Sequence, residues 1–199
     1  LEGGNLSYDE SSNFYTEFPD LQLLTTGKDF QTGKSFDTIS MTSSATAQAA
    51  WLGASIVHHY PDLWPETVRA LIVHSADWTD AMMKATFENK VPKRSDFRNL
   101  MRICGYGVPS LSKAIWSASN RVNIIIEDEI QPFQKKGNSN PTSKEMHIHN
   151  IPWPDDVLLG LEDENVRMRV TLSYFIEPGP GEIGWKDKYR YPSCGLSFD

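Results

Sequence analysis

The sequence has no apolar run long enough to cross a membrane, few cysteines and no excess of positive charge. A bilayer-spanning helix needs roughly 20 consecutive apolar residues, and no stretch of this chain approaches that length. Residues 1–5 contain neither a basic region nor an apolar segment, so we expect no signal peptide. The chain begins without an initiator methionine, and we therefore expect it to be cut from a longer protein.

The charge balance is acidic, with 26 Asp and Glu against 19 Lys and Arg and a net charge of −7 at pH 7. Proteins bind nucleic acids and anionic membranes through clustered Lys and Arg, so we expect neither as a partner. A solvated acidic surface that keeps the protein soluble accounts for this balance. Hydrophobic residues make up 39% of the 199 residues, which is sufficient for a buried core.

Only two cysteines are present, Cys104 and Cys194. Two cysteines in a chain of this length do not make a disulfide framework, and no CxxC pair signals a zinc ribbon. We interpret them as two free thiols rather than as one bridge. This favours a reducing compartment, and the expected location leans towards the cytoplasm.

The patterning predicts an α/β first part and a β-rich second part that meet at about residue 120. Short strands are expected over residues 21–26 and 35–41, on either side of a turn with two glycines. An Ala-rich helix is expected over residues 42–60, and because it is apolar over most of its circumference we expect it to be buried. Further helices are predicted from Pro65 to about Ala76, at 109–118, and in part of 77–99.

After residue 120, apolar and polar residues alternate with a period of two. This pattern predicts strands over residues 121–130, 144–151 and 166–176, the last being the most regular. A strand that begins near residue 195 is also expected. The second part is therefore predicted to be β-rich.

Ser43, near the start of the Ala-rich helix, is the candidate for chemistry. A helix N-terminus carries unpaired N–H groups and the positive end of the dipole, which together can stabilise an oxyanion beside a serine hydroxyl. Small neighbouring residues leave room for a substrate backbone. Alone this pattern is weak, because Ser and Thr at helix starts are ordinarily N-caps.

The wider stretch resembles the subtilisin-like serine peptidases, the subtilases of family S8. Their nucleophile motif is Gly-Thr-Ser-x-Ala-x-Pro before a long Ala-rich helix, and Thr42, Ser43 and Ala45 match it. Residues 60–71 look like the next turn and helix of that family. The Gly-Tyr-Gly of residues 105–107, before a short helix, looks like the end of its catalytic domain.

The resemblance implies an incomplete α/β catalytic domain over residues 1–120, with helices packed on a partial sheet. Over residues 121–199 it implies a β-rich, sandwich-like extension, as in a bacterial subgroup of the family. It further implies that Ser43 is the nucleophile, with its backbone N–H in the oxyanion hole. Thr42 and Ser44 would lie beside a peptide or protein substrate, and no cofactor and no metal are implied.

The chain departs from the motif where Met41 replaces the Gly and Ala47 replaces the Pro. The Met41 side chain would crowd a substrate or change the local backbone. The subtilisin chain order is Asp, His, Ser, yet no histidine precedes Ser43. The Asp, the His and several strands would lie upstream, so we expect this chain alone to be inactive. Strand edges left exposed would favour self-association.

Two other functions remain open. Because of Met41, the parent protein could be a pseudo-peptidase, and residues 121–199 could form a protein-binding β-sandwich module. Neither needs a nucleophile.

The remaining histidines and acidic clusters are interpreted as structural. His58 and His59, at a helix end, are expected to interact with the helix dipole. His147 and His149 lie two apart on one strand face and could bind a metal with a third ligand. Because no other His or Cys is near in sequence, we predict no metal there. The acidic runs 127–129 and 162–164 lack the spacing of a calcium loop and are predicted to be solvated turns.

Overall fold

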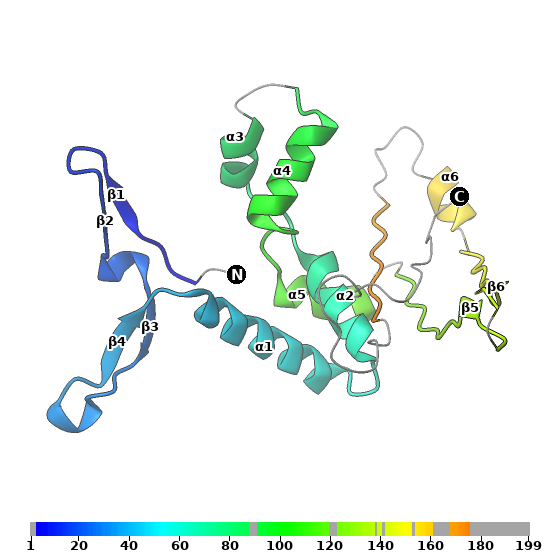
Figure 1. Cartoon of the computed structure of the whole chain (residues 1–199), viewed down its shortest axis with the longest axis horizontal. Coiled ribbons are helices and arrows are strands. Elements are labelled where there is room, and N and C mark those ends of the chain that lie inside the picture. Colours follow the sequence, from blue (N-terminus) through cyan, green and yellow to red (C-terminus); the bar gives the residue numbers. More distant parts are fainter. Residues whose placement is uncertain are drawn as a thin grey trace. The chain divides into compact units, whose positions relative to one another are not determined.

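The computed structural model describes residues 3–87, 91–119, 123–137, 139–140, 142–152, 154–160 and 168–175. The chain divides into two compact units, Leu1–Asn123 and Ile124–Asp199. Each unit is described by itself, with its elements labelled in Figure 1. Among the described residues, none of the helices combines the length and apolarity that a membrane span requires.

The first unit begins with two antiparallel β-hairpins, β1 (Ser7–Asp9) with β2 (Phe14–Thr16) and β3 (Leu23–Thr26) with β4 (Phe36–Ile39). Short 3-10 turns lie at Pro19–Leu21 and Phe30–Thr32. The strands predicted at 21–26 and 35–41 are therefore present in shortened form. They pair with each other across the turn that contains the two glycines.

The helices of the first unit are α1 (Thr42–His59), α2 (Pro65–Ser75), α3 (Asp80–Phe87), α4 (Arg94–Cys104) and α5 (Leu111–Ser119). Helices α1, α2 and α5 lie close to the predicted ranges and α3 lies within 77–99, whereas α4 extends beyond the predicted stretch to Cys104. Pro65 occupies the first turn of α2, where its missing N–H costs nothing, and Glu66 faces the positive end of the helix dipole.

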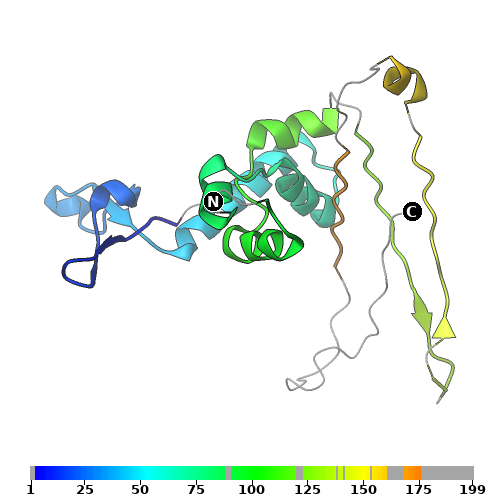
Figure 2. The same cartoon turned by 90° about the horizontal axis from the view of Figure 1, so that it is seen from above.

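The core of this unit lies where α1, α2 and α5 meet (Figures 1 and 2). Ile56 of α1 is fully buried and packs with Val68 and Leu71 of α2 and Ala114 of α5. The Tyr60 hydroxyl, at the end of α1, donates a hydrogen bond of 2.8 Å to the carbonyl of Ile115. Segments more than 50 residues apart are thus held in one apolar cluster.

A second contact region joins α3 and α4. Phe87 and Phe97 meet edge to face, with ring centroids 5.1 Å apart. The Trp78 indole N–H donates to the Gly105 carbonyl at 3.0 Å, and Leu100 is fully buried. These contacts hold the α3–α4 pair against the loop that leads to α5.

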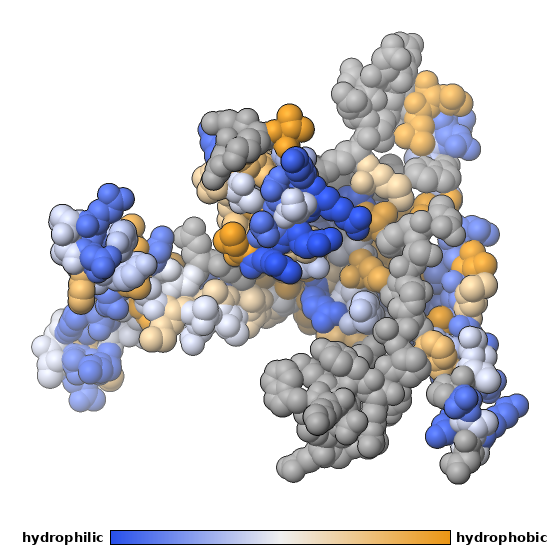
Figure 3. All heavy atoms as spheres, turned by 45° about the horizontal axis from the view of Figure 1, so that its top comes forward, coloured by the Kyte–Doolittle hydropathy of each residue, from blue (hydrophilic) through white to orange (hydrophobic). Residues whose placement is uncertain are grey.

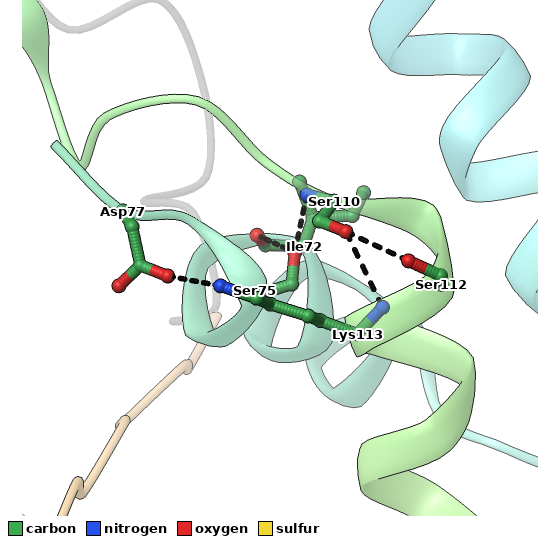
Figure 4. A network of polar contacts seen from close by, with 6 residues as sticks. All are labelled: Ile72, Ser75, Asp77, Ser110, Ser112 and Lys113. Carbon is green, nitrogen blue, oxygen red and sulfur yellow. Dashed lines mark hydrogen bonds and ion pairs between the residues drawn. The ribbon is translucent and has the colours of Figure 1, made fainter. Parts of the chain in front are cut away.

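A polar network fixes the end of α2 to the start of α5 (Figure 4). The Ser75 hydroxyl, on a residue only 3% exposed, donates to the Ile72 carbonyl at 2.8 Å and accepts from the Ser110 N–H at 3.2 Å. Lys113 of α5 forms an ion pair with Asp77 just beyond α2. The buried hydroxyl is therefore satisfied on both sides, as burial requires.

Backbone pairing between Asp77 and Val108 reinforces the same junction, with N–H···O distances of 3.1 and 2.9 Å. Gly107 makes this approach sterically feasible. Its φ is +99°, and a Cβ on it would lie 2.3 Å from the Asp77 carbonyl oxygen. Any other residue there would push the two segments apart.

The expectation that the Ala-rich helix is buried is wrong. In α1 only Leu52 and Ile56 are buried, whereas Trp51 is 60% exposed and Val57 44% exposed. The cause is that α2 and α5 cover one side of α1, and no other described element packs against it to a comparable extent. Figure 3 shows apolar residues, drawn in orange, on the visible face of the molecule.

The second unit contains β5 (Phe133–Gln134), β6 (Thr142–Ser143) and α6 (Asp155–Leu159). β5 and β6 form a short antiparallel hairpin. None of the residues described in this unit is buried. The mixed α/β class is therefore confirmed, while the sandwich-like extension remains a prediction.

The three strands predicted after residue 120 are wrong over their described parts. No strand is present at 123–130, 144–151 or 168–175; residues 121, 122, 166, 167 and 176, and the strand expected near 195, lie outside the described residues. Alternation supplies an apolar face, but a strand also needs a regular ladder of backbone hydrogen bonds to a neighbouring segment. Consistent with this, Val170 is 44% and Leu172 49% exposed.

The core arrangement predicts different outcomes for two isoleucine substitutions. Ile56→Ala should lower the free energy of unfolding by about 2–5 kcal/mol, because it opens a cavity between three helices. Ile103→Ala, at a position 78% exposed, should change it by less than about 0.5 kcal/mol. Denaturant unfolding followed by circular dichroism of the helices measures both, and equal losses would contradict this description of the core.

Candidate active site

Ser43 lies in the first turn of α1, directly after the hairpin β3–β4. The residue is exposed, and its hydroxyl has no hydrogen-bonding partner among the described residues. The N–H of Ser44 donates to the Met41 carbonyl at 3.0 Å, whereas the N–H of Ser43 reaches no described carbonyl. A free hydroxyl and an open backbone donor therefore lie together at the positive end of an 18-residue helix.

The first described residues support the loop that enters α1. The Gly3 carbonyl accepts a hydrogen bond of 2.6 Å from the Met41 N–H. A Cβ on Gly3 would lie 2.3 Å from the Met41 oxygen, and one on Gly4, whose φ is +90°, would lie 2.9 Å from the Ser40 Cα. This role was not predicted from the sequence, although the two adjacent glycines were a signal for it.

Met41 caps α1 without straining the backbone. Its φ of −162° and ψ of 158° are extended values that any residue adopts, so this position does not require the glycine of the subtilase motif. Whether Met41 changes the local backbone relative to the motif remains a prediction. The side chain is 68% exposed and lies two residues before Ser43, so crowding of a substrate remains a prediction.

The histidines of the first unit do not serve Ser43 as a base in this arrangement. His58 and His59 occupy the last turn of α1, fifteen and sixteen positions further along the same helix, and hence roughly 22 Å from Ser43. His59 Nδ1 lies 2.8 Å from the Ser55 carbonyl oxygen. Among the described residues, no imidazole or carboxylate hydrogen-bonds with Ser43.

The prediction of two free thiols can be compared with the structure at one of the two cysteines. Cys104 is free and half-buried, and it lines a shallow hollow between α3 and α4 together with apolar residues such as Met82 and Ile103. That hollow contains none of the predicted site residues. Cys194 lies outside the described residues.

The strand β4, which precedes α1 in sequence, carries an exposed ion pair. The Lys34 ammonium group donates to Asp37 at 3.0 Å, and the Thr38 N–H donates to the same carboxylate at 3.0 Å. These hydrogen bonds lower the pKa of Asp37 below its ordinary value. Because the pair is exposed, it ties the β3–β4 turn to β4 without a large contribution to stability.

Ser44, predicted to lie near substrate, is half-buried with an unsatisfied hydroxyl. Its Oγ is inaccessible to solvent and has no hydrogen-bonding partner among the described residues. A buried hydroxyl without a partner costs free energy. Ser44 therefore carries a buried hydroxyl that makes no hydrogen bond within the described part of this chain.

Residues 1–107, more than half of the 199, match the family model for the subtilase family. The chain belongs to the subtilase family. No curated protein and no solved structure matches it. The resemblance carried by Thr42, Ser43 and Ala45 is thereby confirmed, and this subtilase chain has its origin in a serine peptidase and hence in a hydrolase.

The match ends at Gly107, whereas the compact first unit continues to Asn123. Helix α5 lies in that interval and packs against α1 and α2. The core of this subtilase chain therefore needs residues beyond the matched stretch. The division into a catalytic part at 1–120 and an extension at 121–199 remains a prediction.

Ser44 and Ser75 are expected to respond differently when each is replaced by alanine, because only the Ser75 hydroxyl is hydrogen-bonded. Ser44→Ala should leave the free energy of unfolding unchanged or raise it, because a buried unpaired hydroxyl is removed. Ser75→Ala should lower it by about 1–3 kcal/mol, because the Ser110 N–H loses its partner. Parallel denaturant titrations measure both, and a loss at Ser44 as large as that at Ser75 would contradict the assignment.

The hydrogen bond between Lys34 and Asp37 makes a part of the free energy of unfolding depend on pH. Because the folded pKa of Asp37 is lowered, its stabilising contribution is complete above the unfolded pKa and is lost as pH falls through the folded pKa. Lys34→Met should raise the pKa of Asp37 towards its ordinary value. Lys28→Met, which removes the more weakly interacting lysine, should shift it less. Carboxyl NMR titration measures both, and an unchanged pKa in the Lys34 variant would refute the cause.

Proposed function

We propose that this chain is part of a serine endopeptidase that hydrolyses peptide bonds through an acyl-enzyme on Ser43. The observation that carries the proposal is the exposed, unpaired hydroxyl of Ser43 beside its own open N–H at the start of α1. Membership of the subtilase family supports it. A peptide or protein is the substrate, and no cofactor is needed.

In this proposal Ser43 Oγ attacks the scissile carbonyl carbon as a base removes its proton. The carbonyl oxygen becomes an oxyanion, which the Ser43 N–H and the positive end of α1 stabilise. The tetrahedral intermediate collapses to an acyl-enzyme with loss of the amine, and water then releases the acid. Thr42 and Ser44 flank the bound backbone.

The base comes from outside this chain. Of the histidines in the first unit, His58 and His59 lie at the far end of α1 and His74 lies in α2, none hydrogen-bonded to Ser43. A serine hydroxyl without an adjacent base is a poor nucleophile. The catalytic His and Asp are contributed by sequence upstream, so the chain alone is inactive.

In this proposal, the upstream part of the catalytic domain also buries the exposed apolar residues of α1. Trp51 and Val57 are both exposed apolar residues of that helix. Contiguous apolar surface favours association. In the parent protein the upstream strands pack there, and the isolated chain self-associates instead.

Two alternative functions rest on specific residues. The exposed Met41 side chain beside Ser43 favours a pseudo-peptidase, because it narrows the space for a substrate backbone. The exposed alternating residues Val170 and Leu172 favour a protein-binding module in the second unit. Active-site labelling separates the endopeptidase from both.

The test is intact-mass labelling with a fluorophosphonate, which reacts with activated serines. The full-length parent should take up one label that Ser43→Ala abolishes and that Ser55→Ala, a control in the same helix but remote from Ser43, retains. This chain alone should take up none. Labelling of neither protein would favour the alternatives, and Ser43-dependent labelling of this chain would show that it contains its own base.

A further inference from the structure

The second unit brings together three side chains with metal-binding atoms. Asp128, His147 and His149 each offer one ligand atom, and these atoms all lie within 4.8 Å of one another. Asp128 Oδ2 lies 2.5 Å from His147 Nδ1 and 3.3 Å from His149 Nε2. One carboxylate oxygen is therefore shared between two imidazoles, whose ring planes are inclined at 76°.

The hairpin β5–β6 explains why these distant residues meet. Its register pairs Phe133 with Ser143, and continuing that register brings Asp128 level with Ile148, one position from each histidine. Directly opposed residues of a regular ladder share a face, so the contact of Asp128 with both histidines also depends on the irregular backbone that these segments have outside the hairpin. The segments before and after the hairpin run side by side in Figure 2. His147 and His149, two positions apart in an extended segment, can present their rings to the same side.

Polar contacts hold the two segments in this register. The Lys144 N–H donates to the Pro132 carbonyl at 2.9 Å, and the Gln131 N–H donates to the Glu145 carboxylate at 2.6 Å. Lys144 also forms an ion pair with Glu145 at 2.9 Å. The contacts lie between the hairpin and the cluster, so they place Asp128 opposite the histidines.

We propose that Asp128, His147 and His149 bind a divalent transition-metal ion, with Zn²⁺ the best fit. Two imidazole nitrogens and one carboxylate oxygen suit zinc and its neighbours, whereas calcium and magnesium prefer oxygen ligands alone. Tetrahedral zinc with bonds of about 2.0–2.2 Å separates its ligand atoms by about 3.4 Å. Small side-chain rotations bring the three atoms to that separation and leave a fourth position for water.

The ion takes the place of the hydrogen bonds within the cluster. In the metal-free arrangement each imidazole can donate an N–H to the shared Asp128 oxygen. Metal binding uses the lone pair of the ligating nitrogen, so in each neutral imidazole the N–H then lies on the other ring nitrogen. Glu127 and Glu129, which flank Asp128 in sequence, add negative charge that favours a cation.

The consequence for this unit is structural. None of its described residues is buried, so apolar packing contributes little to holding its extended segments together. A metal bound across residues 123–132 and 142–152 supplies that free energy, as in small metal-stabilised domains. This assignment replaces the expectation of no metal, which rested on the absence of a third His or Cys nearby.

The test uses the whole chain, stripped of metal and titrated with Zn²⁺ against a chromophoric chelator. The wild type should bind one ion per chain, and Asp128→Asn and His149→Gln should each weaken binding more than about tenfold. His58→Gln and His59→Gln, which alter a histidine pair outside the cluster, should not. Wild-type affinity in both cluster variants would overturn the proposal.

A measurement on the unaltered protein guards against variants that fail to fold. Imidazole NMR signals of His147 and His149 should shift on addition of one equivalent of Zn²⁺, while those of His58, His59 and His74 stay in place. Co²⁺ should give the strong visible absorption of a tetrahedral site. Absence of both signals would show that the cluster is only a hydrogen-bonded ion pair.

Discussion

Burial of Ile56 between three helices is the interaction on which the first unit depends. α1 and α2 are neighbours in sequence, but α5 arrives only after α3 and α4, and Ala114 closes the cluster around Ile56. The Tyr60–Ile115 hydrogen bond fixes the same junction from the end of α1. Since helices gain most of their stability from tertiary packing, this cluster is what holds the helix that carries Ser43.

The same packing buries one end of α1 and leaves the other end exposed. Its C-terminal half contributes Leu52 and Ile56 to the interior, while its N-terminus projects Ser43 to solvent with an unpaired N–H. A helix anchored at one end can present a rigid set of dipoles at the other. In the proposed mechanism, oxyanion stabilisation needs donors that are fixed before the reaction begins. Anchoring of α1 by the core would provide that fixation, but it would not provide a base.

The second unit differs from the first because none of its described residues forms a buried apolar core. Its apolar residues alternate as in a sheet, yet Val170 and Leu172 remain exposed, and the contacts that bring its segments together are polar. Asp128, His147 and His149 form one of these polar contacts. Among the described residues of this unit, polar contacts rather than a buried interior therefore join the segments.

The sequence by itself determined the features that depend on local chemistry. Helix α1 follows from its Ala-rich run and α2 from Pro65 and its periodic apolar face, and the motif around Ser43 was sufficient to recognise the family. Tertiary structure alone decided which side of α1 is covered, that Gly3 supports Met41, and that Asp128 joins two histidines. Each depends on segments distant in sequence, and strand pairing failed as a prediction for the same reason: a pattern specifies a face, but only a regular hydrogen-bonded ladder with another segment completes the strand.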